Sequence, residues 1–152
     1  MEPYFDLGTY TRQTSTASAD AQTWFDRGLV WSYAFHHEEA IRCFEHALEH
    51  DPAFAPAHWG IAYAIGPNYN KQWEAFDPVD LAASLRRARD EVAAARACAD
   101  GATPVERALV EALARRYQAN DPSAQLEAWN ADYAGAMRAR TRRRDLVARL
   151  VE

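Results

Sequence analysis

Apolar residues recur at helical spacing in the first third of the chain. Positions i, i+4 and i+7 are filled in two successive segments, by Trp24, Gly28 and Trp31 and then by Ala40, Phe44 and Ala47. This spacing places each set on one face of a helix. Gly28 and Ala40 are small, which lets two helices approach closely while the aromatic rings, Trp24, Trp31 and Phe44, fill the core between them. Pro52 cannot continue a helix interior and therefore marks the start of the next helix.

Proline after a capping residue marks further helix starts. The pairs with this pattern are Asp51-Pro52, Asp77-Pro78, Thr103-Pro104 and Asp121-Pro122. Thr103 and Glu106 also have capping-box spacing. We predict helices over residues 20–34, 37–50, 53–65, 78–99, 103–119 and 122–140. No Val/Ile/Thr alternation is long enough for a strand, so the predicted fold class is all-α, with about three antiparallel helix pairs.

The second and third pairs keep the helical period with different residues. In the second pair, the places of Trp24, Arg27, Gly28 and Trp31 are taken by His58, Ile61, Ala62 and Ile65. The third pair carries the period through Val105, Leu109, Leu113 and Tyr117, and then through Leu126, Trp129, Tyr133 and Met137. A long loop over residues 66–73 lies between the helices of the second pair.

Length and composition suit one globular unit, because the chain has 152 residues of which 49% are hydrophobic. We expect residues 1–19 to be an irregular lead-in that lies over the first helix and is anchored by Tyr4, Phe5 and Tyr10. Residues 20–140 form the predicted helical domain. Residues 141–152 are predicted to be a basic tail or an extension of the last helix.

Residues 24–52 resemble the tetratricopeptide repeat and match its strong positions except at Arg27, which replaces the usual leucine. A narrower resemblance, to one bacterial family of such repeats, is carried by residues 6–10, 21–29, 35–40, 51–52, 58–64, 66–70 and 103–109. The resemblance implies a right-handed helix-hairpin solenoid that acts as a scaffold, with no established reaction. His36 departs from the family pattern, which has asparagine at this position.

Members of that family are longer, so the chain resembles their N-terminal part. An open solenoid end leaves an apolar face uncovered, because terminal repeats usually need a polar cap. We therefore expect homodimerisation through this end, or packing of the C-terminal tail over it.

A concave aromatic face is the predicted binding surface for a peptide or partner helix. Its candidate residues on the first helices of the pairs are Phe25, Leu29, Tyr33, Trp59 and Tyr63, and those on the long loop are Asn68, Tyr69, Asn70, Lys71 and Trp73. Asn68 and Lys71 are expected to set the polarity of this surface. An aromatic groove suits peptide docking. The alternative is that the aromatic rings belong to the core.

All five histidines fall between residues 36 and 58. A transition metal is the alternative ligand, with candidate residues His37, Cys43, His46, His50 and His58, because Cys43, His46 and His50 stand at i, i+3 and i+7. Structural roles are the simpler interpretation, with His58 as a satisfied interface residue. The zinc-protease motif is absent, since Ile41 stands where its second histidine must be. No cofactor is otherwise expected.

Catalytic motifs are missing: there is no nucleophile elbow and no glycine-rich phosphate loop. An enzyme is therefore not favoured. A small-molecule site, if present, is predicted between the loop residues Asn68–Lys71 and the pair His36 and His37.

Charge is uneven, with a net −5 overall but six arginines against two acidic residues in 138–152. A basic helix end complements the helix dipole and needs no ligand, and no aromatic residues lie among these arginines to stack bases. Nucleic acid is therefore an unlikely partner. Without a signal sequence or an apolar run of membrane length, and with unpaired Cys43 and Cys98, we expect a cytoplasmic protein and no membrane contact.

Overall fold

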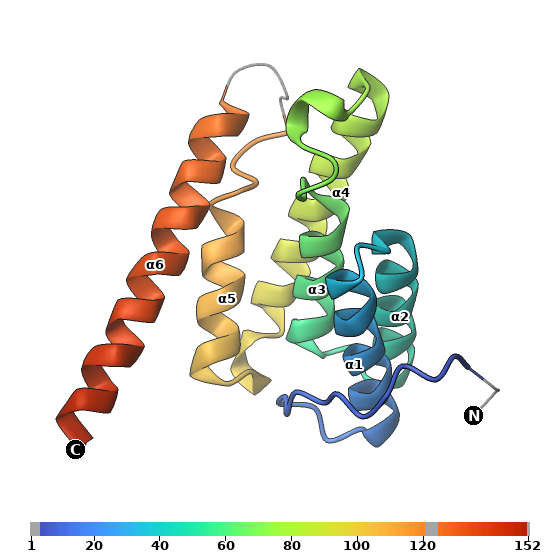
Figure 1. Ribbon diagram of the computed structural model, residues 1–152, viewed down its shortest axis with the longest axis vertical. Coiled ribbons are helices and arrows are strands. Elements are labelled where there is room, and N and C mark those ends of the chain that lie inside the picture. Colours follow the sequence, from blue (N-terminus) through green and yellow to red (C-terminus); the bar gives the residue numbers. More distant parts are fainter. Residues whose placement is uncertain (1–3, 121–124, 152) are drawn as a thin grey trace.

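The computed structural model describes residues 4–120 and 125–151, with side chains up to residue 139. Over these residues the chain forms six α-helices, two short 3₁₀ helices and no strand (Figure 1). They are α1 (Ala19–Tyr33), α2 (His37–His50), α3 (Ala55–Ile65), η1 (Trp73–Ala75), α4 (Pro78–Ala97), η2 (Ala99–Gly101), α5 (Pro104–Ala114) and α6 (Leu126–Val151). The predicted all-α class is confirmed.

Helix α3 is the centre of the array. It packs against α2 on one side and against α4 on the other, and it also contacts α1 and α5. In Figure 1 the helix pairs follow one another across the molecule, with α1 and α2 at one end and α6 beside α5 at the other. The first helices of three successive pairs, α1, α3 and α5, are therefore neighbours.

Phe44 of α2 lies at the centre of the first core, between two glycines. Its side chain is fully buried. A Cβ atom at Gly28 of α1 would lie 2.5 Å from the Phe44 ring, and one at Gly60 of α3 would lie 2.8 Å from it. Because glycine has no Cβ, α1 and α3 can both approach α2 closely at this ring. The close approach at Gly28 was predicted from the sequence. Gly60, in the first helix of the next pair, allows a second close approach to the same ring.

The face of α1 that packs into the core is rotated by about one residue from the predicted face. Phe25 and Leu29 are buried in the core, whereas Trp24 and Trp31 are only partly buried at its edge. The expectation that both tryptophans form the core is thus wrong in part. On a helix each residue is turned by about 100° from the one before it, so Phe25 and Leu29 lie beside Gly28 on the face toward α2 and α3.

The N-terminal segment covers the tryptophans from outside. The Tyr4 ring lies 5.0 Å from the Trp24 ring, and the Trp31 indole Nε1 donates to the Tyr4 hydroxyl over 2.8 Å. The Arg27 guanidinium stacks 4.3 Å from the centre of the Tyr4 ring and 4.4 Å from that of Trp24. An arginine at the usual leucine position is thus accommodated by an aromatic cover that the lead-in provides.

Helix starts follow the predicted caps at two of the four sites. The Asp77 carboxylate accepts from the backbone N–H groups of residues 79 and 80, and Thr103 and Glu106 form a complete capping box. At Asp51 the prediction is wrong, since α3 begins at Ala55. The Asp51 carboxylate instead accepts from Ala53 N–H over 3.2 Å and from Thr16 Oγ1 over 2.6 Å, so it closes a turn. The predicted cap at Asp121 lies outside the described residues.

A second core joins α3, α4, α5 and α6, and Tyr117 fixes its position. The buried Tyr117 hydroxyl donates to the Ala62 carbonyl over 2.7 Å, and its ring lies directly on Gly66, where a Cβ would collide with it. The ring also packs edge-on against buried Trp73, 6.4 Å between centres. These contacts require Tyr117 to leave the helical path, which explains why α5 ends at Ala114 and not at the predicted residue 119.

Helix α6 begins four residues after the predicted start and its backbone continues to Val151. Trp129 is buried against α5 and Tyr133 is partly buried. No helix in the described part of the chain combines the length and the apolar character that crossing a membrane requires. Dimerisation through the end of the array stays a prediction.

Candidate functional site

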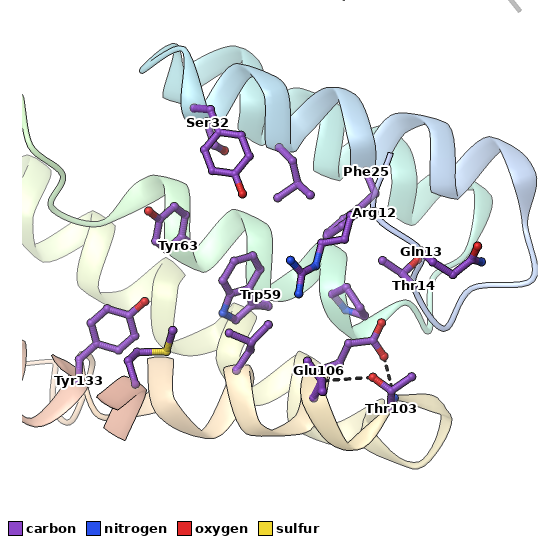
Figure 2. A pocket seen from close by; sticks show the side chains of 16 residues that line it. Arg12, Gln13, Thr14, Phe25, Ser32, Trp59, Tyr63, Thr103, Glu106 and Tyr133 are labelled. Atoms are coloured by element: carbon purple, nitrogen blue, oxygen red, sulfur yellow. Dashed lines mark hydrogen bonds between the residues drawn. The ribbon is translucent and has the colours of Figure 1, made fainter. Parts of the chain in front are cut away.

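A groove with a cavity of about 590 Å³ runs along the face that α1, α3 and α5 share (Figure 2). Its remaining walls come from residues 12–14 of the N-terminal segment and from α6. Each of α1, α3, α5 and α6 contributes side chains at helical spacing, such as Pro56, Trp59 and Tyr63 of α3, at i, i+3 and i+7. The groove is therefore a product of the side-by-side packing of successive helix pairs, and we call it the groove below.

Aromatic rings dominate the middle of the groove. The Trp59 and Tyr63 rings stack, with centres 5.2 Å apart and planes 15° from parallel. Tyr33 is 65% exposed and Tyr63 37% exposed, whereas Phe25 and Leu29 form a buried floor. The buried Trp59 Nε1 has no hydrogen-bond partner among the described residues. Exposed rings above an apolar floor are an arrangement that binds apolar side chains of a partner.

Two charged residues line the groove, and they differ in what they contact. Glu106 is 8% exposed, and its carboxylate accepts from Ser15 N–H over 2.9 Å and from Thr103 N–H over 2.7 Å. It therefore ties the N-terminal segment to the start of α5. The Arg12 side chain forms no hydrogen bond or ion pair with the residues that the structure describes, and Figure 2 draws it reaching into the groove beside Trp59.

The predicted binding residues fall into three places. Phe25, Leu29, Tyr33, Trp59 and Tyr63 all line the groove, but Phe25 and Leu29 are also buried members of the first core, so for Phe25 the alternative of a core position holds as well. The loop residues lie elsewhere: Asn68, Asn70 and Lys71 line a separate cavity of about 530 Å³, and Tyr69 is 85% exposed. Asn68 and Lys71 thus do not set the polarity of the groove.

Trp73, the last predicted binding residue, is only 5% exposed and belongs to the second core. It starts η1, and its ring packs against Phe76 and Tyr117 at 5.5 and 6.4 Å between centres. For Trp73 the alternative of a core position therefore holds. A loop of this length folds back on the helices, and an indole in it is more stable in the core than in solvent.

Sequence reasoning missed the other half of the groove. Arg12 comes from the lead-in, Val105, Glu106 and Leu109 come from α5, and Tyr133 and Met137 come from α6. Leu109, Tyr133 and Met137 were noted only as carriers of the helical period. These residues could have been predicted from the order of the helices. Since α5 is the first helix of its pair, as α1 and α3 are of theirs, its exposed face adjoins the exposed faces of α1 and α3.

The candidate metal ligands do not come together. His46 stacks 4.6 Å from Trp24 and bonds Glu49 over 2.9 Å, while His58 bonds Glu91 of α4 over 2.7 Å. The interface role expected for His58 is thus confirmed. Among the described residues no group of three or more His, Cys, Asp or Glu side chains is placed to hold a metal ion.

Cys43 is buried and His37 is half-buried. Burial raises the pKa of the Cys43 thiol to about 11, and its sulfur lies 3.1 Å from the Tyr4 hydroxyl. The thiol is therefore protonated at neutral pH and is a poor metal ligand. Burial, and then the neighbouring His36, lower the pKa of His37 below its ordinary value, so its imidazole is neutral.

The family model of the tetratricopeptide repeat matches residues 21–54. These residues span α1, α2 and the turn before α3. No curated protein and no solved structure matches the chain. The match and the all-helical fold are consistent with a helix-hairpin solenoid, and repeats of this kind generally mediate protein–protein interaction.

Proposed function

We propose that the protein is an interaction scaffold whose groove binds a peptide segment of a protein partner. The observation that carries this proposal is that one cavity of about 590 Å³ is lined by the first helices of three successive pairs. The tetratricopeptide match over residues 21–54 supports it, because such repeats generally bind proteins. A peptide of several residues that lies along the groove can contact α1, α3 and α5 at the same time.

The lining favours a segment with large apolar side chains. Trp59 and Tyr63 offer stacked rings, and Leu109 of α5 and Met137 of α6 offer aliphatic surface. Aromatic residues of this kind contribute much of the binding energy of protein interfaces. One or two bulky apolar side chains of the partner, seated over Phe25 and Leu29, would exclude water from the groove.

Arg12 favours an acidic group next to those apolar side chains. It is the one basic residue among the described residues that line the groove, and no carboxylate of the described chain pairs with its guanidinium, since Asp26 accepts only from its backbone N–H. Glu106 does not compete for the ligand, because both its oxygens accept backbone N–H groups. A single cation among aromatic rings suits one carboxylate of a peptide better than the repeated phosphates of a nucleic acid.

The test compares two exposed tyrosines in binding measurements. Peptides selected from a displayed library against the purified protein are titrated against the wild type, Tyr63→Ala and Tyr69→Ala. We expect Tyr63→Ala to lower the affinity by about 30-fold, the size of an interface hot spot of about 2 kcal/mol. Tyr69, which lies outside the groove and is 85% exposed, is the matched control and should leave the affinity unchanged. Equal loss in both variants, or none in either, would contradict the proposal.

A second variant tests the charge. Arg12→Gln should lower the affinity for peptides that carry an acidic residue by about tenfold, because a charge-assisted hydrogen bond is lost. Peptides without an acidic residue should bind the variant and the wild type equally. If Arg12→Gln weakens both kinds of peptide alike, the side chain acts through packing and not through its charge.

A further inference from the structure

The second cavity, about 530 Å³, lies at the end of the first two helix pairs and shares no lining residue with the groove. It is open to solvent and is lined by the α1–α2 turn, the first turns of α2, the end of α3, the loop that follows α3, and α4. We call it the hairpin-end cavity. It occupies the place predicted from the sequence for a small-molecule site, between His36–His37 and Asn68–Lys71.

The α1–α2 turn holds a residue in a costly conformation at the edge of this cavity. Phe35 has φ +60°, and it is the one non-glycine residue with positive φ among the described residues. It ends α1 in a left-handed position that glycine usually fills, since His36 N–H bonds the Trp31 carbonyl across it over 2.9 Å. The left-handed conformation costs a non-glycine residue about 1–2 kcal/mol. Nevertheless the ring is 52% exposed, so burial does not offset this cost.

The loop after α3 is closed on itself and presents Lys71. The Asn68 side-chain oxygen accepts from Asn70 N–H over 2.9 Å and from Lys71 N–H over 3.1 Å, while Asn68 N–H donates to the Lys71 carbonyl over 2.9 Å. The turn therefore fixes the backbone of Lys71 before any ligand arrives. Such pre-organisation lowers the entropic cost of binding.

The two charged residues that line the cavity are Lys71 and Glu38, and the charge of Lys71 also interacts with the nearby Asp77 carboxylate. The Lys71 ammonium lies 4.0 Å from the centre of the Phe76 ring. In the described part of the chain neither Lys71 nor Glu38 forms an ion pair, unlike Arg42 with Glu39, Arg87 with Glu45 and Arg96 with Glu111. One cation and one anion on the wall of the same cavity match a ligand that carries both charges.

Apolar residues on the wall supply the third part of the recognition, beside the polar lining residues His36, His37, Asn68, Asn70 and Ser84. Ile41 of α2, Ile65 of α3 and Phe76 present aliphatic and aromatic surface in the same cavity as Lys71 and Glu38. A ligand with a carboxylate, an ammonium group and an apolar side chain would contact Lys71, Glu38 and this surface at the same time. Cavities of this size are typical of small-molecule sites.

We propose that the hairpin-end cavity binds a free amino acid with an apolar side chain. Its carboxylate pairs with the Lys71 ammonium, its ammonium group pairs with the Glu38 carboxylate, and its side chain packs on Ile41, Ile65 and Phe76. A metal ion is a poorer occupant, since no group of three ligating side chains is formed by the described residues and Lys71 would repel a cation. A peptide is also poorer, because it lacks both charges on one α-carbon.

The test is a titration of the full chain, followed by backbone amide resonances, with L-leucine and L-phenylalanine as probes. We expect saturable shifts at Glu38 and Lys71 and none at Trp59 in the groove. Leucine amide lacks the carboxylate and N-acetyl-leucine lacks the ammonium group. Each should bind at least about tenfold more weakly than leucine, the effect of losing one charged hydrogen bond.

Variants then assign the two charges. Lys71→Gln and Glu38→Gln should each weaken leucine binding by about tenfold, whereas Glu74→Gln, an exposed carboxylate on the same loop outside the cavity, should not. Binding of groove peptides should be the same in all three, which separates this proposal from the function of the groove. No saturable shift with either amino acid would overturn the proposal. So would equal binding of the amide and acetyl derivatives, a comparison that needs only the wild-type chain.

Discussion

The first and third helix pairs are held together by different means. Between α1 and α2 the backbones approach closely, because the Phe44 ring fits against Gly28. In the third pair, Leu113 of α5 and Trp129 of α6 belong to the second core, and polar side chains from the segment after α5 add further contacts: Arg116 Nε donates to Asn130 over 3.1 Å and Gln118 Nε2 to Asp132 over 2.8 Å. The first pair depends on one fixed spacing of small and large residues, and the third combines large core side chains with long polar side chains that bond across the pair.

This difference determines how each pair tolerates change. A protein interior is packed as densely as an organic crystal. Adding or removing a methyl group where two helices approach closely therefore lowers the stability of the fold. Long polar side chains can adopt other rotamers when a neighbour changes. We therefore expect the stability of the array to depend most on the first pair, while the third pair adapts.

Removing the Phe44 ring should have the largest effect. Phe44→Ala leaves a cavity between α1, α2 and α3 and should lower the free energy of unfolding by about 3–5 kcal/mol. Urea denaturation followed by circular dichroism measures the change. Phe5→Ala, at a ring that is 67% exposed, is the control and should cost much less. Equal costs for the two would show that the first core does not depend on Phe44.

Adding a methyl group at the close approach should have the next largest effect. Gly28→Ala and Gly60→Ala place a Cβ 2.5 and 2.8 Å from the Phe44 ring, which should cost about 1–3 kcal/mol of stability. Gly135→Ala is the matched control in α6, where nothing lies within 4 Å of the new atom. There alanine should stabilise the helix by up to about 1 kcal/mol. Destabilisation at all three sites would mean that the two regions do not differ.

In the second core, Tyr117→Phe should cost about 1 kcal/mol, because the Ala62 carbonyl loses the hydroxyl that donates to it over 2.7 Å. Thermal unfolding of this variant, compared with Tyr69→Phe on the exposed loop, measures the difference. If Tyr117→Phe unfolds at the wild-type temperature, the hydrogen bond does not anchor the end of α5.

The smallest effect concerns His37 at the turn of the first pair. Because burial lowers the pKa of His37 in the folded protein, the unfolded chain binds its proton at a higher pH than the folded one. The stability due to His37 is therefore complete above its unfolded pKa of about 6.5 and is lost as the pH falls through the folded pKa. Proton NMR of the imidazole should give a midpoint below 6.5, and His37→Gln should reduce the loss of stability at acidic pH. A midpoint at or above the ordinary value would contradict burial of this ring.

The sequence predicted the parts of the fold that depend on local spacing. The helix pair of residues 20–50, the caps at Asp77 and Thr103 and the close approach at Gly28 are all present. The end of α5 was not predictable, because it depends on Tyr117 reaching Ala62 and Gly66, about 50 residues away. The start of α3 shifted for a similar reason, since Asp51 bonds Thr16 of the lead-in.

The site was predictable only where helical spacing defines it. Phe25, Tyr33, Trp59 and Tyr63 share the face of α1 and α3 that helical spacing indicates. Spacing within one helix cannot say which distant elements close the groove, so Arg12 and Met137 were missed. Nor can it place a long loop. Residues 68–71 and Trp73 were assigned to the groove, although the structure divides them between the second cavity, the surface and the core.

The most direct test of the groove compares a tryptophan that lines it with a tryptophan that lies in the second core. Trp59 lines the groove, Trp73 lies in the second core, and the buried Nε1 of each has no hydrogen-bond partner among the described residues. Their indole N–H resonances can be followed separately by NMR while a selected peptide is added. The account predicts that the Trp59 resonance shifts with saturation and that the Trp73 resonance stays in place. A peptide that binds without moving the Trp59 resonance, and moves those of Trp24 and Trp31 on the outer side of α1, would contradict it.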